Sequence, residues 1–156
     1  MLRRPLLPAI GLPLLLPLLL GSCGGPPPPP PTVVNAALSA AADANGAAPV
    51  SLRVYQLVSP AGFEAAQFFP LFNGDAAVLK DDLVKRDDLL LAPGQSRTLT
   101  IAPPDRVKAI GVFAAFRDYE KLAWHTTVAV PPNKTSTLTV VAGAKGVTAK
   151  IEPAKP

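Results

Sequence analysis

Residues 50–58 of this 156-residue chain read Val50-Ser51-Leu52-Arg53-Val54-Tyr55-Gln56-Leu57-Val58. Val50, Leu52 and Val54 alternate with Ser51, Arg53 and Tyr55. Because side chains on a β-strand point alternately to the two faces of a sheet, one face of this segment is apolar and the other is mixed. The pattern predicts a strand whose apolar face lies against a core.

Residues 108–117 carry apolar side chains on both faces of a second expected strand. One face holds Ile110, Val112, Ala114 and Phe116, and the other holds Ala109, Gly111, Phe113 and Ala115. Strands that are buried on both faces are typical of the centre of a covered sheet. We therefore expect this strand to be central.

Similar short segments, broken by Pro, Gly, Asn and Asp, fill the chain from residue 32 onward, which is typical of an all-β sandwich. We expect eight strands, at residues 33–42, 50–58, 86–91, 96–102, 108–117, 122–130, 136–142 and 147–152. The first two are expected to pair across an exposed hairpin-type loop that contains the turn signal Asn45-Gly46, and the last two across residues 143–146. Pro93-Gly94 predicts a type II turn between the third and fourth strands.

Residues 62–83 break the β pattern and favour two short helices. Phe69-Pro70 disfavours helical backbone at Phe69, so the first helix should end near that residue. Asp75 is a good cap for the second helix, with Ala76, Leu79 and Leu83 expected to face the sheet. The segment also gathers Phe63, Phe68, Phe69 and Phe72. Burial of these rings against the sandwich is favoured over a partner surface.

The N-terminus has the pattern of a secretory leader. Arg3 and Arg4 precede an apolar run at residues 5–20, which ends at Leu20-Gly21-Ser22-Cys23. The run is too short and too rich in proline for a membrane-spanning helix. The last four residues resemble the bacterial lipobox, in which cleavage occurs just before a lipidated cysteine. We therefore expect a lipoprotein signal peptide at residues 1–22 and lipidation at Cys23, with a buried free thiol as the alternative.

Residues 23–31 are expected to form a lipidated cysteine and a Gly/Pro-rich tether, and residues 32–156 the β-sandwich domain. Pro26 to Pro31 cannot form a helix or join a sheet interior, and they favour a semi-rigid spacer of about 19 Å. A Pro-rich recognition motif is the alternative for this segment. Gly24 after the cysteine resembles the sorting signal for the outer membrane.

Composition and motifs indicate no catalytic site, metal or cofactor. Residues 23–156 contain 13 Lys and Arg and 11 Asp and Glu, so their net charge is close to neutral. This balance excludes a basic nucleic-acid binder. The single cysteine excludes an internal disulfide and a cysteine-built zinc site.

His125, the only histidine, is expected to be an ordinary outward-facing strand residue opposite Trp124, which should anchor the core. Asp81-Asp82 and Asp87-Asp88 are expected to be solvated and charge-balanced by neighbouring lysine and arginine rather than to bind calcium.

Four segments, in their order and spacing, resemble the TssJ family (also called SciN or VasD) of type VI secretion system lipoproteins. Besides the lipobox, the resembling runs are Val50-Ser-Leu-Arg-Val-Tyr-Gln-Leu, Ala61-Gly-Phe-Glu-Ala-Ala-Gln-Phe-Phe, Leu89-Leu-Leu-Ala-Pro-Gly-Gln-Ser and Ile110-Gly-Val-Phe-Ala-Ala-Phe-Arg-Asp. The family often has a carboxylate where Gln95 stands, and the loop at residues 43–49 is short here. The resemblance covers nearly all of the mature chain.

This resemblance implies a mostly β, eight-stranded transthyretin-like or C2-like sandwich with a short helical insertion. It also implies a non-catalytic lipoprotein in the outer membrane of a Gram-negative bacterium, facing the periplasm, with no small-molecule substrate. Such a protein recruits the periplasmic C-terminal domain of TssM and so helps to assemble the trans-envelope complex. The family's partner-binding loop corresponds to Asp43, Ala44, Asn45, Gly46, Ala47 and Ala48. A periplasmic ligand- or carbohydrate-binding lipoprotein with a transthyretin-like fold is the alternative, and an enzyme that uses His125 is a third possibility.

Overall fold

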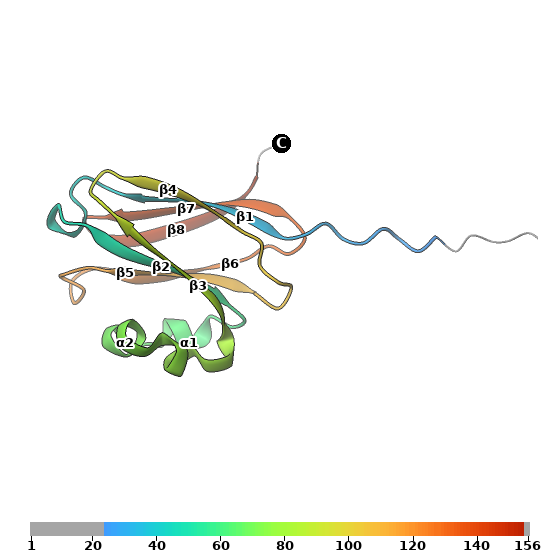
Figure 1. Cartoon of the computed structure of the whole chain (residues 1–156), viewed down its shortest axis with the longest axis horizontal. Helices are drawn as coiled ribbons and strands as arrows, with labels where there is room; N and C mark the ends of the chain where they lie inside the picture. Colours follow the sequence, from blue (N-terminus) through green and yellow to red (C-terminus); the bar gives the residue numbers. More distant parts are fainter. Residues whose placement is uncertain (1–23, 155–156) are drawn as a thin grey trace, which may run out of the picture.

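The computed structural model describes residues 24–154, which form two stacked β-sheets with a small helical layer on one of them (Figure 1). Eight strands lie close to the positions expected from the sequence. They are β1 (Val33–Ala40), β2 (Val50–Leu57), β3 (Leu83–Leu91), β4 (Ser96–Ile101), β5 (Ala109–Ala115), β6 (His125–Ala129), β7 (Thr135–Gly143) and β8 (Gly146–Pro153). The mostly β, eight-stranded sandwich is confirmed.

Each sheet contains four strands, and the chain crosses repeatedly between the sheets. The first sheet has the order β4-β1-β7-β8 and the second has the order β3-β2-β5-β6. β1 pairs antiparallel with β4 and parallel with β7, while β2 pairs antiparallel with β3 and β5. The expected hairpin between the first two strands is therefore wrong. The segment that joins them passes from one sheet to the other.

The main core lies between the sheets and is built from the alternating faces expected from the sequence. β2 contributes Val50, Leu52 and Val54, and β5 contributes Ile110 and Val112, all of them fully buried. β5 lies inside its sheet and buries its other face as well, so its central position is confirmed. Each fully buried aliphatic side chain of this kind contributes about 1.5–3 kcal/mol to folding.

A second, smaller core lies between the other face of the β3-β2-β5-β6 sheet and the helical insertion. α1 (Ala61–Glu64) and α2 (Phe68–Leu79) cover this face, and η2 (Lys80–Asp82) leads into β3. Tyr55, Leu57 and Phe113 from the sheet pack here against the helices. Gly111 makes room for this packing, because a Cβ at that position would lie 3.0 Å from the Phe63 ring and from Leu57 Cδ1.

The helix boundaries differ from the sequence expectation. The first helix ends at Glu64, and α2 begins at Phe68 and contains Phe69-Pro70 within its first turn. Proline is tolerated there because the first N–H groups of a helix have no intrahelical partner. Gly74 interrupts α2 with non-helical dihedral angles, and Asp75 follows this kink and accepts a hydrogen bond from the Ala76 backbone N–H.

The aromatic cluster is only partly buried. Phe63 and Phe68 lie in the second core, whereas Phe69 is 53% exposed and Phe72 is 38% exposed. Leu79 is buried and Leu83 packs against the same core, as expected, but Ala76 is exposed. The kink at Gly74 shifts the register of the second half of α2.

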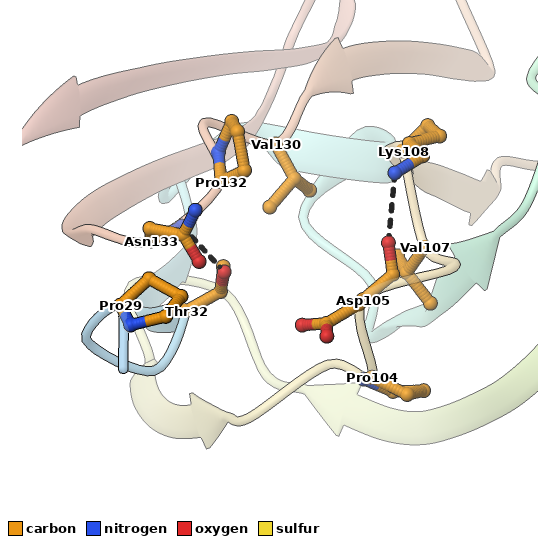
Figure 2. Close-up of a pocket in the computed structure, with 9 residues that line it drawn as sticks. All are labelled: Pro29, Thr32, Pro104, Asp105, Val107, Lys108, Val130, Pro132 and Asn133. Carbon is orange, nitrogen blue, oxygen red and sulfur yellow. Dashed lines mark hydrogen bonds between the residues drawn. The ribbon is translucent and has the colours of Figure 1, made fainter. Parts of the chain in front are cut away.

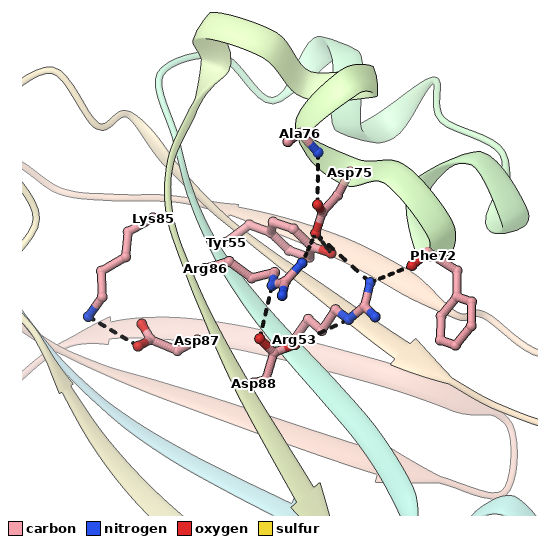
Figure 3. A network of polar contacts seen from close by, with 9 residues as sticks. All are labelled: Arg53, Tyr55, Phe72, Asp75, Ala76, Lys85, Arg86, Asp87 and Asp88. Atoms are coloured by element: carbon pink, nitrogen blue, oxygen red, sulfur yellow. Dashed lines mark hydrogen bonds and ion pairs between the residues drawn. The ribbon is translucent and has the colours of Figure 1, made fainter.

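Polar side chains connect the insertion to the sheet through a network around Asp75 (Figure 3). Asp75 Oδ2 accepts hydrogen bonds from Tyr55 Oη at 3.0 Å and from Arg86 Nη1 at 2.5 Å. Arg53 donates from Nη1 to the Phe72 carbonyl at 2.9 Å and pairs through Nε with Asp88 at 3.2 Å. The network thus joins β2, β3 and α2.

The pKa values in this network reflect burial and pairing. Burial raises the pKa of Tyr55 to about 12. Burial also acts to raise the pKa of Asp75, but the hydrogen bonds from Arg86 and Tyr55 outweigh it and hold this pKa below its usual value. Asp75 is therefore charged and Tyr55 neutral at neutral pH.

Candidate partner-binding loop

The loop between β1 and β2 folds tightly over the end of the sandwich. It contains the 3₁₀ turn η1 (Ala44–Gly46), and Asn45, Gly46 and Ala47 have φ values of 52°, 64° and 58°. Left-handed backbone favours Gly and Asn, which explains why an Asn-Gly pair stands here although the loop closes no hairpin.

Asn45 holds this loop in place. Its side chain is buried, its Nδ2 donates to the Pro49 carbonyl at 2.8 Å, and its Oδ1 accepts from the Arg117 N–H at 2.8 Å. Ala44 and Ala48 are buried as well, so only Asp43, Gly46 and Ala47 of the six predicted contact residues present themselves to solvent. The expectation of an exposed loop is thus correct for half of these residues.

The loop lies at one end of the molecule with three other connections. Because β1 runs away from the tether, residues 41–49 lie at the end of the sandwich opposite to it, beside residues 92–95, 116–124 and 143–146 (Figure 1). We call this end the distal pole. A surface depression of about 280 Å³ there is lined by Asp43, Asn45, Gly46, Arg117, Asp118, Leu122 and Ala144.

The segment at residues 116–124 is attached to the rest of this pole through the β7–β8 turn. Ala123 forms a bridge with Gly146, where the Val147 N–H donates to the Ala123 carbonyl at 2.7 Å. Gly146 has φ 128°, and a Cβ there would lie 2.4 Å from the Ala123 carbonyl oxygen. Glycine is therefore required where these two segments meet.

The tether enters at the opposite end, which we call the tether pole (Figure 2). The Asn133 N–H donates to Thr32 Oγ1 at 2.8 Å and the Val33 N–H donates to the Lys134 carbonyl at 3.0 Å. A pocket of about 310 Å³ separates Pro29 and Thr32 from residues 104–108. These bonds fix where the tether joins the sandwich. Cys23 and the leader at residues 1–22 lie outside the described residues.

Two further candidate residues, Trp124 and His125, make packing contacts with each other and with the core. His125 does not face away from Trp124: the two rings stack with centroids 3.8 Å apart, since β6 begins only at His125 and Trp124 precedes it. Trp124 is half-buried and packs against both cores. Within residues 24–154, no three His, Cys, Asp or Glu side chains gather in a way that could hold a metal ion.

Asp87 and Asp88 form ion pairs with different cations. On β3, Asp87 pairs with Lys85 and Asp88 pairs with Arg53 and Arg86, so the expected charge balance is present. The sequence does not predict the buried ion pair of Asp75, because its partner Arg86 lies on a strand that the sequence does not place beside it.

Among residues 24–154, none of the helices has the length and hydropathy that crossing a membrane requires.

The fold and the loop together define a β-sandwich module that presents surface loops at two ends. The family model described as "Type VI secretion lipoprotein, VasD, EvfM, TssJ, VC_A0113" matches residues 32–145. The chain belongs to this family. It is accordingly a component of the secretion apparatus with a structural role and not an enzyme.

Solved structures agree with this assignment. The T6SS lipoprotein TssJ1 from Pseudomonas aeruginosa is 34% identical with a TM-score of 0.76, and the alignment covers 81% of this chain and 100% of that one. Serratia marcescens Lip, described as a membrane bound component of the Type VI Secretion System, is 27% identical with a TM-score of 0.71, covering 80% and 98%.

A third matching chain comes from the structure titled "T6SS protein TssM C-terminal domain (869-1107) from EAEC". It has 24% identity and a TM-score of 0.58, covers 79% of this chain and 99% of that one, and shows likeness of fold alone. The comparison with curated protein sequences finds no match.

Proposed function

We propose that the chain is an outer-membrane lipoprotein that faces the periplasm and recruits the periplasmic C-terminal domain of TssM to the type VI secretion trans-envelope complex. The observation that carries the proposal is the placement of the β1–β2 loop and the tether at opposite poles. A lipid at the tether pole would leave the distal pole free to meet a partner that crosses the periplasm.

The anchor in this proposal is a lipid on Cys23, exposed by removal of residues 1–22. Multiple acyl chains hold a domain on a bilayer almost irreversibly, since each buried methylene contributes about 0.8 kcal/mol. Residues 24–31 then act as a spacer between the bilayer and Thr32. Replacement of Cys23 by serine should abolish labelling with palmitate and leave residues 1–22 attached, because cleavage at a lipobox requires the lipidated cysteine; a larger, unlabelled chain on a gel is the expected result.

The partner in this proposal is supported by the membership of the chain in the type VI secretion lipoprotein family. The interior between the two sheets of the described chain is filled by buried side chains such as Leu38, Leu52 and Leu138. A ligand-binding sandwich would need a cavity between its sheets, so this packing lends no support to the ligand-binding alternative.

A charge reversal at each pole tests the proposed orientation. Asp43 and Asp105 are both exposed, the first at the distal pole and the second at the tether pole. Asp43→Arg should weaken binding of the TssM domain about tenfold, and Asp105→Arg should leave it unchanged. Equal affinities for the two variants would remove the loop from the interface, and normal effector secretion after deletion of the gene would contradict the proposed function itself.

A further inference from the structure

The β1–β2 loop offers too little surface to form a stable interface by itself. A standard protein interface buries about 800 Å² on each partner and involves about 20–30 residues a side. Its strongest contacts come from Tyr, Trp, Arg and other large side chains. The exposed members of the loop are Ala42, Asp43, Gly46, Ala47 and Pro49, none of which is an aromatic anchor.

Exposed aromatic side chains lie on the insertion next to the distal pole. Phe69 is 53% exposed and Phe72 is 38% exposed. Tyr119, which is half-buried, stacks on Phe68 at a centroid distance of 4.2 Å and meets Phe69 edge-on at 5.2 Å. We call Phe69, Phe72 and Tyr119 the aromatic patch. Its rings are held from below by Phe68 and Phe113, so little conformational freedom remains to be lost on binding.

The segment at residues 117–119 connects the loop to the aromatic patch. Arg117 donates its N–H to Asn45, and Arg117 and Asp118 line the depression together with Asp43 and Gly46. Tyr119 is two residues from Arg117, a span of at most about 7 Å. The surface therefore continues from the loop, across the depression, onto the aromatic rings.

Within residues 24–154, neither end of the chain covers this patch. The described tether leaves at the tether pole, and β8 also ends there, since Pro153 pairs with Ser136 at the start of β7. Residues 24–31 extend from the sandwich at the tether pole, at the opposite end from residues 41–49 (Figure 1).

We propose that the aromatic patch of Phe69, Phe72 and Tyr119 is the hydrophobic anchor of the same interface, covered by the periplasmic domain of TssM when this domain binds the β1–β2 loop. The inference rests on the proposed function and adds a binding surface on the insertion. The loop then sets the position of the partner, while burial of the aromatic rings supplies most of the affinity.

The test uses the full-length chain, purified from membranes in detergent, and the TssM periplasmic domain of the same bacterium. Phe69→Ala and Tyr119→Ala should each raise the Kd at least tenfold. Val141→Ala, at a 36% exposed position on the outer face of β7, is the matched control and should not change it. Hydrogen exchange on the unmodified complex gives a second readout that needs no variant: residues 67–73 and 117–121 should become protected together with residues 41–48.

Three outcomes would overturn the inference. The variants could bind as tightly as the parent chain, or protection could be confined to residues 41–48. Phe69→Ala could also abolish self-association of the chain, seen by sedimentation, without changing the Kd for TssM, which would assign the patch to a second copy. Failure of the parent chain to bind the TssM domain at all would instead contradict the proposed function.

Discussion

Tyr55 on β2 donates a hydrogen bond from Oη to Oδ2 of Asp75 on α2 at 3.0 Å, inside the second core. The same carboxylate oxygen accepts from Arg86 on β3. A single buried carboxylate thus holds the helical insertion on two neighbouring strands. Its environment leads to two predictions about stability.

Replacement of Tyr55 by phenylalanine should lower the free energy of unfolding by about 1.5–3 kcal/mol at pH 7, because one buried hydrogen bond to a charged group is lost while the ring packing remains. Tyr119→Phe is the control, since its hydroxyl bonds only to exposed Glu120 at 3.4 Å. Urea unfolding of the two variants measures the difference. Equal stabilities would mean that the hydrogen bond from the Tyr55 hydroxyl to Asp75 does not contribute to the free energy of unfolding.

Stability should fall in acid through Asp75. The pKa of Asp75 in the folded chain lies below its ordinary value of 3.8, because the bonds from Arg86 and Tyr55 outweigh the effect of burial. The folded state therefore favours the charged carboxylate, and this contribution is complete above about pH 4 and is lost as the pH falls through the lower, folded pKa. Asp75→Asn should be less stable at pH 7 and should show a smaller further loss between pH 4 and pH 2. A parallel decline in both proteins would assign the acid sensitivity to other carboxylates.

Gly146→Ala should destabilise the distal pole. A Cβ at this position would lie 2.4 Å from the Ala123 oxygen, and alanine disfavours the φ of 128°. We expect a loss of about 2 kcal/mol or more. Gly143→Ala, in the same turn, is the matched control, because its nearest contact is 3.8 Å away. Thermal unfolding should separate the two variants, and hydrogen exchange should locate the disturbance at residues 117–123.

Two substitutions at Asn45 separate the contribution of its side-chain hydrogen bonds from that of its left-handed backbone. Asn45→Ala loses both side-chain hydrogen bonds and places alanine at φ 52°, so a cost of about 2–3 kcal/mol is expected. Asn45→Gly loses the same bonds but tolerates the backbone, and its cost should be about 1 kcal/mol smaller. If the two variants unfold at the same denaturant concentration, backbone strain plays no part at this position.

Alternation along the chain predicted where strands occur but not how they pair. The faces of β2 and β5 could be assigned from Val50, Val54 and Ile110, since only the period of the pattern matters there. The assignment of β1 and β2 to different sheets depends on contacts between distant segments, about which a turn signal such as Asn45-Gly46 says nothing. The same holds for Asp75, whose partner Arg86 is brought near only by the pairing of β2 with β3.

Local rules failed at two places for identifiable reasons. The Phe69-Pro70 pair predicts the end of a helix, yet the first turn of a helix accepts proline because its N–H is not needed. Strand alternation predicts opposite faces for Trp124 and His125, but Trp124 lies just before β6 and its ring stacks on the imidazole. The predicted loop residues and Cys23 remain predictions.

The parallel pairing of β1 with β7 affects how the domain reaches its native state. Val33 pairs with Thr135 and Val34 with Ile101, so the first strand depends on partners that are synthesised much later. Closing such long chain segments costs entropy before any contact offsets it, which slows folding. If the proposed leader directs the chain through a translocation channel from its N-terminus, β1 must wait without its neighbours until almost the whole chain has crossed. The main core would then close only after translocation is nearly complete.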